Sequence, residues 1–382
     1  MVEILGKCIL CGKESLLVSK TIGVCVDCLR NNYFKAYKII EKVHETSRNK
    51  YELPPRTPSF EKGVKCNICG RGCMLAQSIK GYCGSKIRIN NSIVPTTMKH
   101  DVSIGLYYYD PHPTNCVAYS VCPAVTGRGY PRYALTPNGE RGFFNIAVFY
   151  GSCNMDCLYC QNWEYRKMTR DKKPLLTTNE LIESVNSKTT CVCFFGGDPG
   201  PWSTHALYSA MKMLEKAREL GLKIFRICWE TNGLWNPQLF KKAIEMSLET
   251  GGIVKIDFKA WSYEVYSALT GIDEKEHLEL IKKNIALAAE YFSQRPDPPL
   301  LVVSTLLVPG YVDEYEIEHM TRYVAELDRN IPYIFLGFHP DYLLIDLPRT
   351  SINHAKKAVE IAKRNGLRNV YIENKWLLST LY

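Results

Sequence analysis

The 382-residue sequence predicts an α/β fold, namely an incomplete barrel preceded by N-terminal cysteine-rich metal-binding modules. From about residue 141, apolar strand candidates alternate with helix candidates, and this alternation is typical of a parallel sheet. About six such units favour a partial (β/α)6 barrel over a closed barrel of eight. Thirteen of the 16 cysteines precede residue 161, which indicates that the first part of the chain is organised around metal ligands.

The strand candidates are apolar segments that end in glycine or polar residues. In order, they are 143–151, 191–197, 223–233, 252–259, 300–310, 333–340 and 369–374. Helices are expected near 177–187 and 203–220, and a third has its apolar stripe between 317 and 327. Since the strands are expected to run in one direction, ligand-binding residues should gather at their carboxyl ends.

The chain divides into three expected units. Residues 1–50 are expected to form a zinc-ribbon-like four-cysteine module plus a helix, because so few residues cannot build a core without a staple. Residues 51–140 begin with a proline-rich linker and are expected to form an irregular, cysteine-rich module wrapped on the main domain. Residues 141–382 are expected to form the partial barrel.

Composition and hydropathy indicate a cytoplasmic protein without a membrane partner. Hydrophobic content of 46% and charged content of 23% are ordinary for a globular protein. No segment approaches the roughly 20 apolar residues that a membrane span needs, and charges interrupt the short apolar run at the N-terminus. In a reducing compartment, disulfides are not expected, so metal or cluster ligation is the first interpretation of the 16 cysteines.

The net charge of +9 is unevenly distributed. Residues 1–150 contain 20 Lys/Arg and 10 Asp/Glu, a surplus of +10, and the remainder sums to −1. This surplus predicts either a face for nucleic acid or an acidic partner, or a solvated face whose charge is compensated by metal thiolates. If the face binds RNA, then Arg71, Lys80, Lys86 and Arg88 are its expected contacts.

The segment GSCNMDCLYCQNW (151–163) places Cys153, Cys157 and Cys160 directly after a strand. Three thiolates at this spacing can hold three corners of an iron–sulfur cube, which normally takes four ligands. A coordination position left open is typical of a catalytic metal. The alternatives are a zinc site completed by a distant residue, or reduced cysteines in a core.

This Cys-x3-Cys-x2-Cys spacing, with Tyr159 before the last cysteine, resembles the radical S-adenosylmethionine (SAM) superfamily. FFGGDPG (194–200) is similar to the Gly-Gly-Glu-Pro motif of that family, with Asp198 in place of Glu. The resemblance implies a 4Fe–4S cluster that binds SAM, and a backbone at Gly196 and Gly197 that pairs with the SAM amino group.

Later segments resemble the branch that contains pyruvate formate-lyase activating enzyme and the AmmeMemoRadiSam proteins. These segments are CWETNG (228–233), KIDFKAW (255–261), LLVPGYVDE (306–314) and FHPDY (338–342). The resemblance implies that the SAM region includes Glu230, Asn232, Asp257, Lys259 and His339.

The same resemblance implies that Glu230, Thr231 and Asp257 hold a monovalent cation, although Glu230 replaces the Asp of the family. Two simpler interpretations compete with these roles. Lys259 and Asp257 could form a buried salt bridge, and His339 could be a satisfied core imidazole.

The other cysteines form two modules and several isolated thiols. Cys8, Cys11, Cys25 and Cys28 have the spacing of a four-cysteine zinc site. Cys66, Cys69, Cys73 and Cys83 predict a second metal, either zinc or an auxiliary cluster. Cys116 and Cys122 are interpreted as free buried thiols, with metal ligands or a redox pair as the alternative, and Cys191 and Cys193 as core residues.

The resemblance implies reductive cleavage of SAM to a 5′-deoxyadenosyl radical, followed by hydrogen abstraction from a protein or peptide. A flavodoxin- or ferredoxin-like reductant is the implied partner. The alternatives are a methyltransferase that could use cobalamin, an RNA-modifying enzyme, and a non-enzymatic electron-transfer or metal-scaffold protein.

Overall fold

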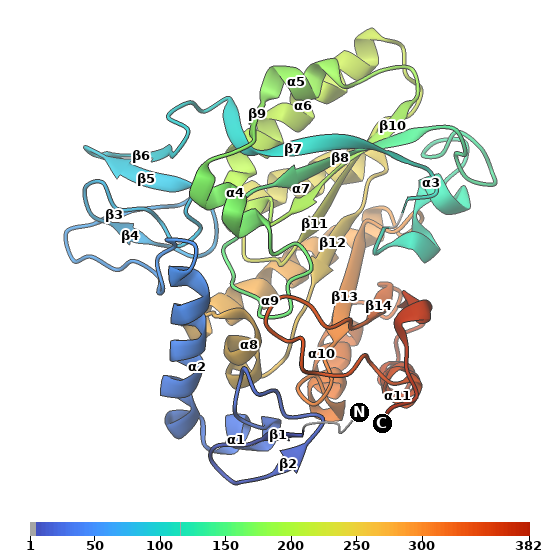
Figure 1. Ribbon diagram of the computed structural model, residues 1–382. Coiled ribbons are helices and arrows are strands. Elements are labelled where there is room, and N and C mark those ends of the chain that lie inside the picture. Colours follow the sequence, from blue (N-terminus) through green and yellow to red (C-terminus); the bar gives the residue numbers. More distant parts are fainter. Residues whose placement is uncertain (1–4, 115) are drawn as a thin grey trace.

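A nine-stranded sheet forms the centre of the computed structural model, which describes residues 5–114 and 116–382 (Figure 1). The strand order is β15–β14–β13–β12–β11–β10–β8–β7–β9. Strands β8 and β10 to β15 run parallel to one another, whereas β7 is antiparallel to both β8 and β9. Within the described ranges, the edge strands β15 and β9 are not paired with each other, so the sheet is open. The predicted α/β class with a large parallel sheet is confirmed.

The site described below is formed at the carboxyl ends of the parallel strands. Their bounds are β7 (Val102–Pro111), β8 (Phe144–Tyr150), β9 (Leu175–Thr177), β10 (Thr189–Gly196), β11 (Arg226–Thr231), β12 (Val254–Asp257), β13 (Leu301–Leu307), β14 (Tyr333–Gly337) and β15 (Val370–Glu373).

The helices lie mostly between consecutive parallel strands. Their bounds are α1 (Val26–Asn31), α2 (Tyr33–Asn49), α3 (Pro123–Thr126), α4 (Tyr165–Asp171), α5 (Thr178–Glu183), α6 (Ser203–Glu219), α7 (Pro237–Thr250), α8 (Tyr263–Thr270), α9 (Lys275–Glu290), α10 (Glu314–Leu327) and α11 (Ile352–Arg364). The 3-10 helices are η1 (Tyr119–Val121), η2 (Gly200–Trp202), η3 (Phe292–Gln294) and η4 (Lys375–Leu377).

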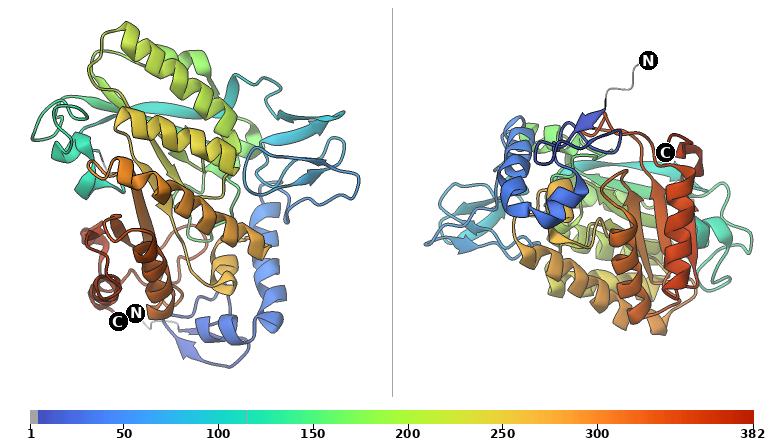
Figure 2. Two further views of the ribbon diagram at one scale, coloured as in Figure 1. Left: turned by 180° about the vertical axis from the view of Figure 1, so that it is seen from behind. Right: turned by 90° about the horizontal axis from the view of Figure 1, so that it is seen from below.

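Local sequence explains where several of these helices begin. Thr177 and Glu180 form a reciprocal capping box at the start of α5. Asn236 caps α7, with Pro237 as its first residue, and Gly251 in the left-handed region ends the helix. The helices α6, α7 and α9, coloured yellow-green to orange, lie side by side across one face of the sheet (Figure 2, left).

The N-terminal third contains three two-stranded sheets, formed by β1 (Gly6–Lys7) with β2 (Glu14–Ser15), β3 (Val64–Lys65) with β4 (Met74–Leu75), and β5 (Lys86–Ile89) with β6 (Ser92–Pro95). Helix α2 runs between the first of these sheets and the other two (Figure 1). Among the described residues, no helix combines the length and the hydropathy that crossing a bilayer would require.

The structure differs from the sequence-based expectation in one part of the main sheet. The segment 64–140 was expected to be irregular, but β7 within it pairs with β8 over seven residues and joins the central sheet. The parallel part has seven strands, one in each of the seven segments expected to form a strand. Strand β7 gave little signal because its second half is mostly exposed and carries three successive tyrosines, so apolar residues do not alternate.

Candidate functional site

A cavity of about 900 Å³ lies at the carboxyl ends of the parallel strands. The loop that follows β8 supplies Cys153, Cys157 and Cys160 to its wall. The ends of β10, β11 and β12 supply the remaining expected residues except His339; these are Gly196, Gly197, Asp198, Glu230, Thr231, Asn232, Asp257 and Lys259. Tyr159 also lines the cavity. The fold therefore brings together side chains that are up to 106 residues apart between Cys153 and Lys259.

The sulfurs of Cys153, Cys157 and Cys160 are spaced too widely for one ion. Among the described residues, one group has three or more metal-ligating atoms of His, Cys, Asp or Glu within 4.8 Å of one another, and that group is Cys8, Cys11, Cys25 and Cys28. The three loop sulfurs do not meet this limit. A tetrahedral ion at about 2.3 Å from sulfur places its sulfurs about 3.8 Å apart, whereas the irons of a cube occupy separate corners and hold their thiolates farther apart. The donor set of the loop therefore fits a cluster better than a zinc ion.

Two glycines hold the end of β10 tightly against the start of the cysteine loop. A Cβ on Gly196, whose φ is +107°, would lie 2.5 Å from the Tyr150 nitrogen, and one on Gly197 would lie 2.0 Å from the Ser152 oxygen. The nitrogens of Gly197 and Asp198 donate to the carbonyls of Tyr150 and Ser152 at 2.9 and 2.8 Å. Only glycine fits at either position, because any side chain would push the loop away.

The carboxylate of Asp198 links β10 to β11. It accepts hydrogen bonds from the hydroxyl of Thr231 at 2.9 Å, the nitrogen of Asn232 at 2.7 Å and the nitrogen of Gly200 at 2.7 Å. Burial raises the pKa of Asp198 to about 6, although these hydrogen bonds oppose the shift. Since its oxygens are occupied within the protein, this side chain shapes the cavity wall and leaves the adjacent backbone to face a ligand.

Asn232 connects β11 to the cysteine loop. Its amide group donates to the Cys153 sulfur at 3.7 Å and to the side-chain oxygen of Asn154 at 2.8 Å. The amide of Asn154 in turn donates to the Leu234 carbonyl at 2.6 Å. Hydrogen bonds to a thiolate sulfur help to set the potential of an iron–sulfur centre. Asn154 was not predicted from the sequence.

Asp257 and Lys259 form the salt bridge that was the alternative interpretation, and both still line the cavity. The Lys259 ammonium lies 5.8 Å from the centroid of the Tyr159 ring. The Oδ1 atom of Asp257 is buried and has no hydrogen-bond partner among the described residues. A buried oxygen without a partner is costly, so this atom marks a place where a polar ligand fits.

Two of the residues expected to hold a monovalent cation have partners within the protein. Glu230 accepts from the Lys255 ammonium at 2.7 Å, and Thr231 donates to Asp198 at 2.9 Å. The negative charge of Glu230 is therefore paired with a lysine of the same sheet. Glu230, Thr231 and Asp257 all line the cavity, and their binding of a cation stays a prediction.

His339 is the one expected site residue that the structure places outside the cavity lining. Its side chain is 49% exposed and pairs with Asp341 at 3.2 Å. It is therefore neither a core imidazole nor part of the cavity. Phe338 before it is buried, so the chain turns its next side chain outward at this point.

Cys116 and Lys255 are functional candidates that sequence reasoning missed, since Cys116 was interpreted as a free buried thiol. Both line the cavity, and the Lys255 ammonium donates to the sulfurs of Cys116 and Cys193 at 3.1 and 3.2 Å. A hydrogen bond with Cys122, followed by the charge of Lys255, lowers the pKa of Cys116 to about 7. Cys191 and Cys193 are buried in β10, as expected. The one sequence signal was Lys255 within an otherwise apolar strand.

Asp156 anchors the cysteine loop from within. Its carboxylate is fully buried and receives hydrogen bonds from Arg166 of α4 at 2.7 and 3.0 Å and from Ser47 of α2 at 3.1 Å. It also contacts the ring of His44 of α2 at 3.0 Å. Although burial opposes ionisation, Arg166 and His44 hold the pKa of Asp156 well below its usual range.

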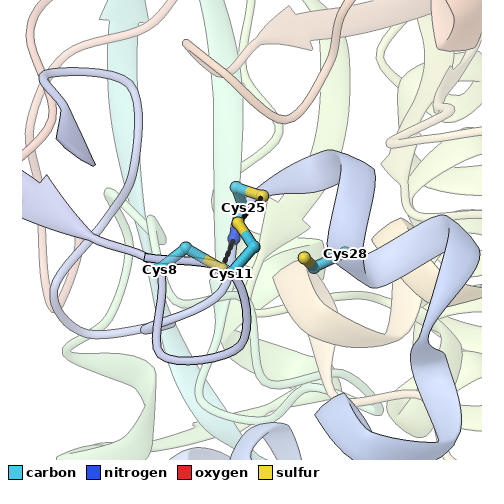
Figure 3. A group of neighbouring side chains, drawn as sticks. All are labelled: Cys8, Cys11, Cys25 and Cys28. Carbon is cyan, nitrogen blue, oxygen red and sulfur yellow. Dashed lines mark hydrogen bonds between the residues drawn. The ribbon is translucent and has the colours of Figure 1, made fainter. Parts of the chain in front are cut away.

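The first cysteine module has the geometry of a single-ion site (Figure 3). The sulfurs of Cys8, Cys11, Cys25 and Cys28 all lie within 4.8 Å of one another, and those of Cys11 and Cys25 are 3.8 Å apart. The Cys25 nitrogen donates to the Cys8 sulfur at 3.4 Å. This separation matches that of a tetrahedral ion, about 3.8 Å.

The expected RNA face is not available as a whole. Arg71 and Lys86 are only 2% and 4% exposed, so their charges cannot reach a nucleic-acid backbone. Arg71 pairs with Asp273 at 2.9 Å and donates to the Asn154 carbonyl at 2.9 Å. The expectation that these two residues contact RNA is therefore wrong, because both are used inside the protein.

Comparisons with known proteins agree with this site. Residues 147–324, from within β8 to within α10, match the family model of the radical SAM superfamily. The chain is 26% identical over 328 residues to an uncharacterized protein of Methanocaldococcus jannaschii, and the match covers 81% of each. It is 24% identical over 202 residues to pyruvate formate-lyase 1-activating enzyme of Escherichia coli strain K12, covering 50% of this chain and 75% of that enzyme.

A solved domain of pyruvate-formate lyase-activating enzyme from Bacteroides vulgatus is 18% identical to this chain, with a TM-score of 0.34. That similarity covers 44% of this chain and 94% of the domain.

Replacing Asp156 with Ala should lower the free energy of unfolding by about 3–5 kcal/mol, because it leaves Arg166 buried without a counter-charge. Chemical denaturation of the reconstituted protein measures this loss. Asp171→Ala is the matched control, since Asp171 is exposed and pairs with exposed Arg170 on the same helix. Equal stability of the two variants would contradict the anchoring role of Asp156.

Cys116 should react with iodoacetamide with a half-point near pH 7, because only the thiolate is nucleophilic. Peptide mapping after brief labelling should show Cys116 modified earlier than Cys228, a similarly half-buried thiol whose pKa is raised by burial. Lys255→Met should slow labelling of Cys116 several-fold at pH 7, whereas Lys212→Met on the surface should not. An unchanged labelling rate of Cys116 in the Lys255 variant would contradict the proposal that the Lys255 charge lowers the pKa of Cys116.

Proposed function

We propose that this chain, a member of the radical SAM superfamily, uses Cys153, Cys157 and Cys160 to hold a 4Fe–4S cluster that binds SAM. When bound, this pair supplies a 5′-deoxyadenosyl radical by one-electron cleavage of SAM, and the radical abstracts hydrogen from a substrate. One observation carries the proposal above the others. Three widely spaced thiols share a cavity with the unpartnered Asp257 oxygen and the Lys259 ammonium.

The chain's own residues position SAM and protect it. The backbone beside Gly197 is held open to the cavity by the packing of the two glycines, which suits it to pair with an amino group. Lys259 can bind a carboxylate and Asp257 can accept from a hydroxyl or amino group at its free oxygen. Asp198 and Asn232 hold these strand ends in register with the loop.

We propose a protein or peptide as the substrate. Similarity to an enzyme whose name describes the activation of another enzyme supports this class. The cavity volume of about 900 Å³ lies near the upper end of the range for small-molecule sites, so it leaves room for a side chain beside SAM. The electron donor is proposed to be a flavodoxin- or ferredoxin-like protein.

We further propose that Cys8, Cys11, Cys25 and Cys28 bind zinc as a structural ion. The four thiols close a tetrahedral site and leave no position for a substrate. Arg30 of α1 ties this module to the barrel through Asp313 and Glu316 at the start of α10. The ion would therefore stabilise the module that precedes α2, the helix that contacts the cysteine loop through His44 and Ser47.

Cys157→Ala should abolish SAM cleavage, because two thiolates cannot hold the cluster in place. Anaerobic reconstitution with iron and sulfide, followed by measurement of 5′-deoxyadenosine after dithionite reduction, tests this. In the matched variant Cys8→Ala, cleavage per cluster should persist while zinc content and thermal stability fall. Continued cleavage by the Cys157 variant would contradict the ligand assignment, and no cleavage by the native protein would overturn the proposed function.

Lys259→Met should weaken SAM binding about 10- to 100-fold, since a charge-assisted hydrogen bond contributes about 1.5–3 kcal/mol. Equilibrium dialysis of the reconstituted protein with labelled SAM measures the affinity without turnover. Lys282→Met is a suitable control, because Lys282 lies over Trp261 and does not line the cavity. Unchanged affinity in the Lys259 variant would contradict SAM binding by Lys259 and would show that this residue serves only in the salt bridge with Asp257.

A further inference from the structure

We propose that Cys66, Cys69, Cys73 and Cys83 hold a second iron–sulfur cluster, and not a zinc ion, directly beside the radical SAM loop. The four cysteines lie at the ends of β3, β4 and β5, and their exposed fractions are between 4% and 8%. This assignment does not depend on which substrate the enzyme uses or on whether SAM is cleaved.

The spacing of the sulfurs carries the choice of metal. The Cys66 nitrogen donates to the Cys73 carbonyl at 2.8 Å, and both residues pack in one buried cluster with Tyr82, the neighbour of Cys83. Yet no three of the four sulfurs lie within 4.8 Å of one another, whereas all four sulfurs of the Cys8 module do. The Cys8 module shows the sulfur spacing of a single-ion site in this chain. The sulfurs of Cys66, Cys69, Cys73 and Cys83 are spread more widely than that, as are those of Cys153, Cys157 and Cys160. A cluster fills such a space, and one ion does not.

The charges around the four thiols point to a negatively charged centre. Lys86, three residues after Cys83, is 4% exposed, and its ammonium lies 3.9 Å from the Trp202 ring. A buried positive charge is costly unless an opposite charge lies near it. Four thiolates on a cluster would give that opposite charge, whereas four neutral core thiols would not.

Backbone donors also approach these sulfurs. The Tyr82 nitrogen donates to the Cys73 sulfur at 3.5 Å, and the hydroxyl of Ser85 contacts the Cys83 sulfur at 3.2 Å. Tyr82 itself lies under two buried guanidinium groups, those of Arg48 and Arg71, at 3.4 and 3.6 Å. Such N–H···S contacts and nearby positive charges are the means by which proteins stabilise reduced clusters.

The second set of cysteines packs directly against the first. Ser152 donates to the Cys83 carbonyl at 3.1 Å. The Leu234 carbonyl accepts from both the Gly70 nitrogen at 3.0 Å and the Asn154 amide at 2.6 Å, so it bridges the two segments. Arg71 donates to the carbonyl of Asn154, the residue next to Cys153. The two cysteine sets are therefore joined by single hydrogen bonds, and a cluster in each would give the protein two neighbouring one-electron centres.

The test separates the two clusters by removing the first. The full-length triple variant Cys153→Ala/Cys157→Ala/Cys160→Ala, reconstituted with iron and sulfide, should keep about four irons per chain, against about eight in the native protein. Mössbauer and electron paramagnetic resonance spectra should show one cluster in the variant. Adding Cys69→Ser and Cys73→Ser should remove it. Adding Cys191→Ser and Cys193→Ser, which replaces two other buried thiols, should leave the iron count unchanged.

Iron absent from the triple variant, with two zinc ions per chain, would overturn the proposal in favour of zinc. No metal beyond the Cys8 site would overturn it in favour of core thiols. Should the triple variant fail to fold, the native protein still decides the question. Eight irons with spin coupling between two reduced clusters support the proposal, and four irons with a single uncoupled signal overturn it. SAM cleavage can fail without affecting any of these readouts.

Discussion

The buried carboxylate of Asp156 holds the cysteine loop in the position on which the cavity depends. It lies between Cys153 and Cys157 in the chain, so fixing this residue fixes the sulfurs on both sides of it. Its partners come from α2 and from α4, two helices on different sides of the loop. A charge network of this kind stabilises only when every member is paired, which makes the loop and both helices a single unit.

This arrangement explains why the N-terminal cysteine modules are integral to the catalytic domain. Helix α2 follows the first module and reaches the loop through His44 and Ser47. The second module contacts the same loop through Cys83 and Arg71. The packing of both modules therefore bears on the position of the loop that lines the cavity.

The cavity is lined both by residues that fix the positions of the strand ends and by residues whose side chains can bind a ligand. Glycine packing and the Asp198 hydrogen bonds set the positions of strand ends, while Asp257, Lys259 and the loop thiols are available for ligands. Opposite them, Lys255 links Glu230, Cys116 and Cys193. Of this second group, Lys255, Glu230 and Cys116 line the same cavity as the loop thiols.

The sequence by itself determined the alternating strands, the cysteine spacing and the glycine motif, because each depends on residues close together in the chain. The resemblance to the radical SAM superfamily and most of the cavity residues followed from those local patterns, and residues 147–324 match the model of that family. Only the tertiary structure decided which distant groups meet. It paired Glu230 with Lys255, turned His339 outward, buried Arg71 and Lys86, and brought Cys116 to the cavity. These outcomes depend on packing and desolvation between segments far apart in sequence, and no local pattern encodes them.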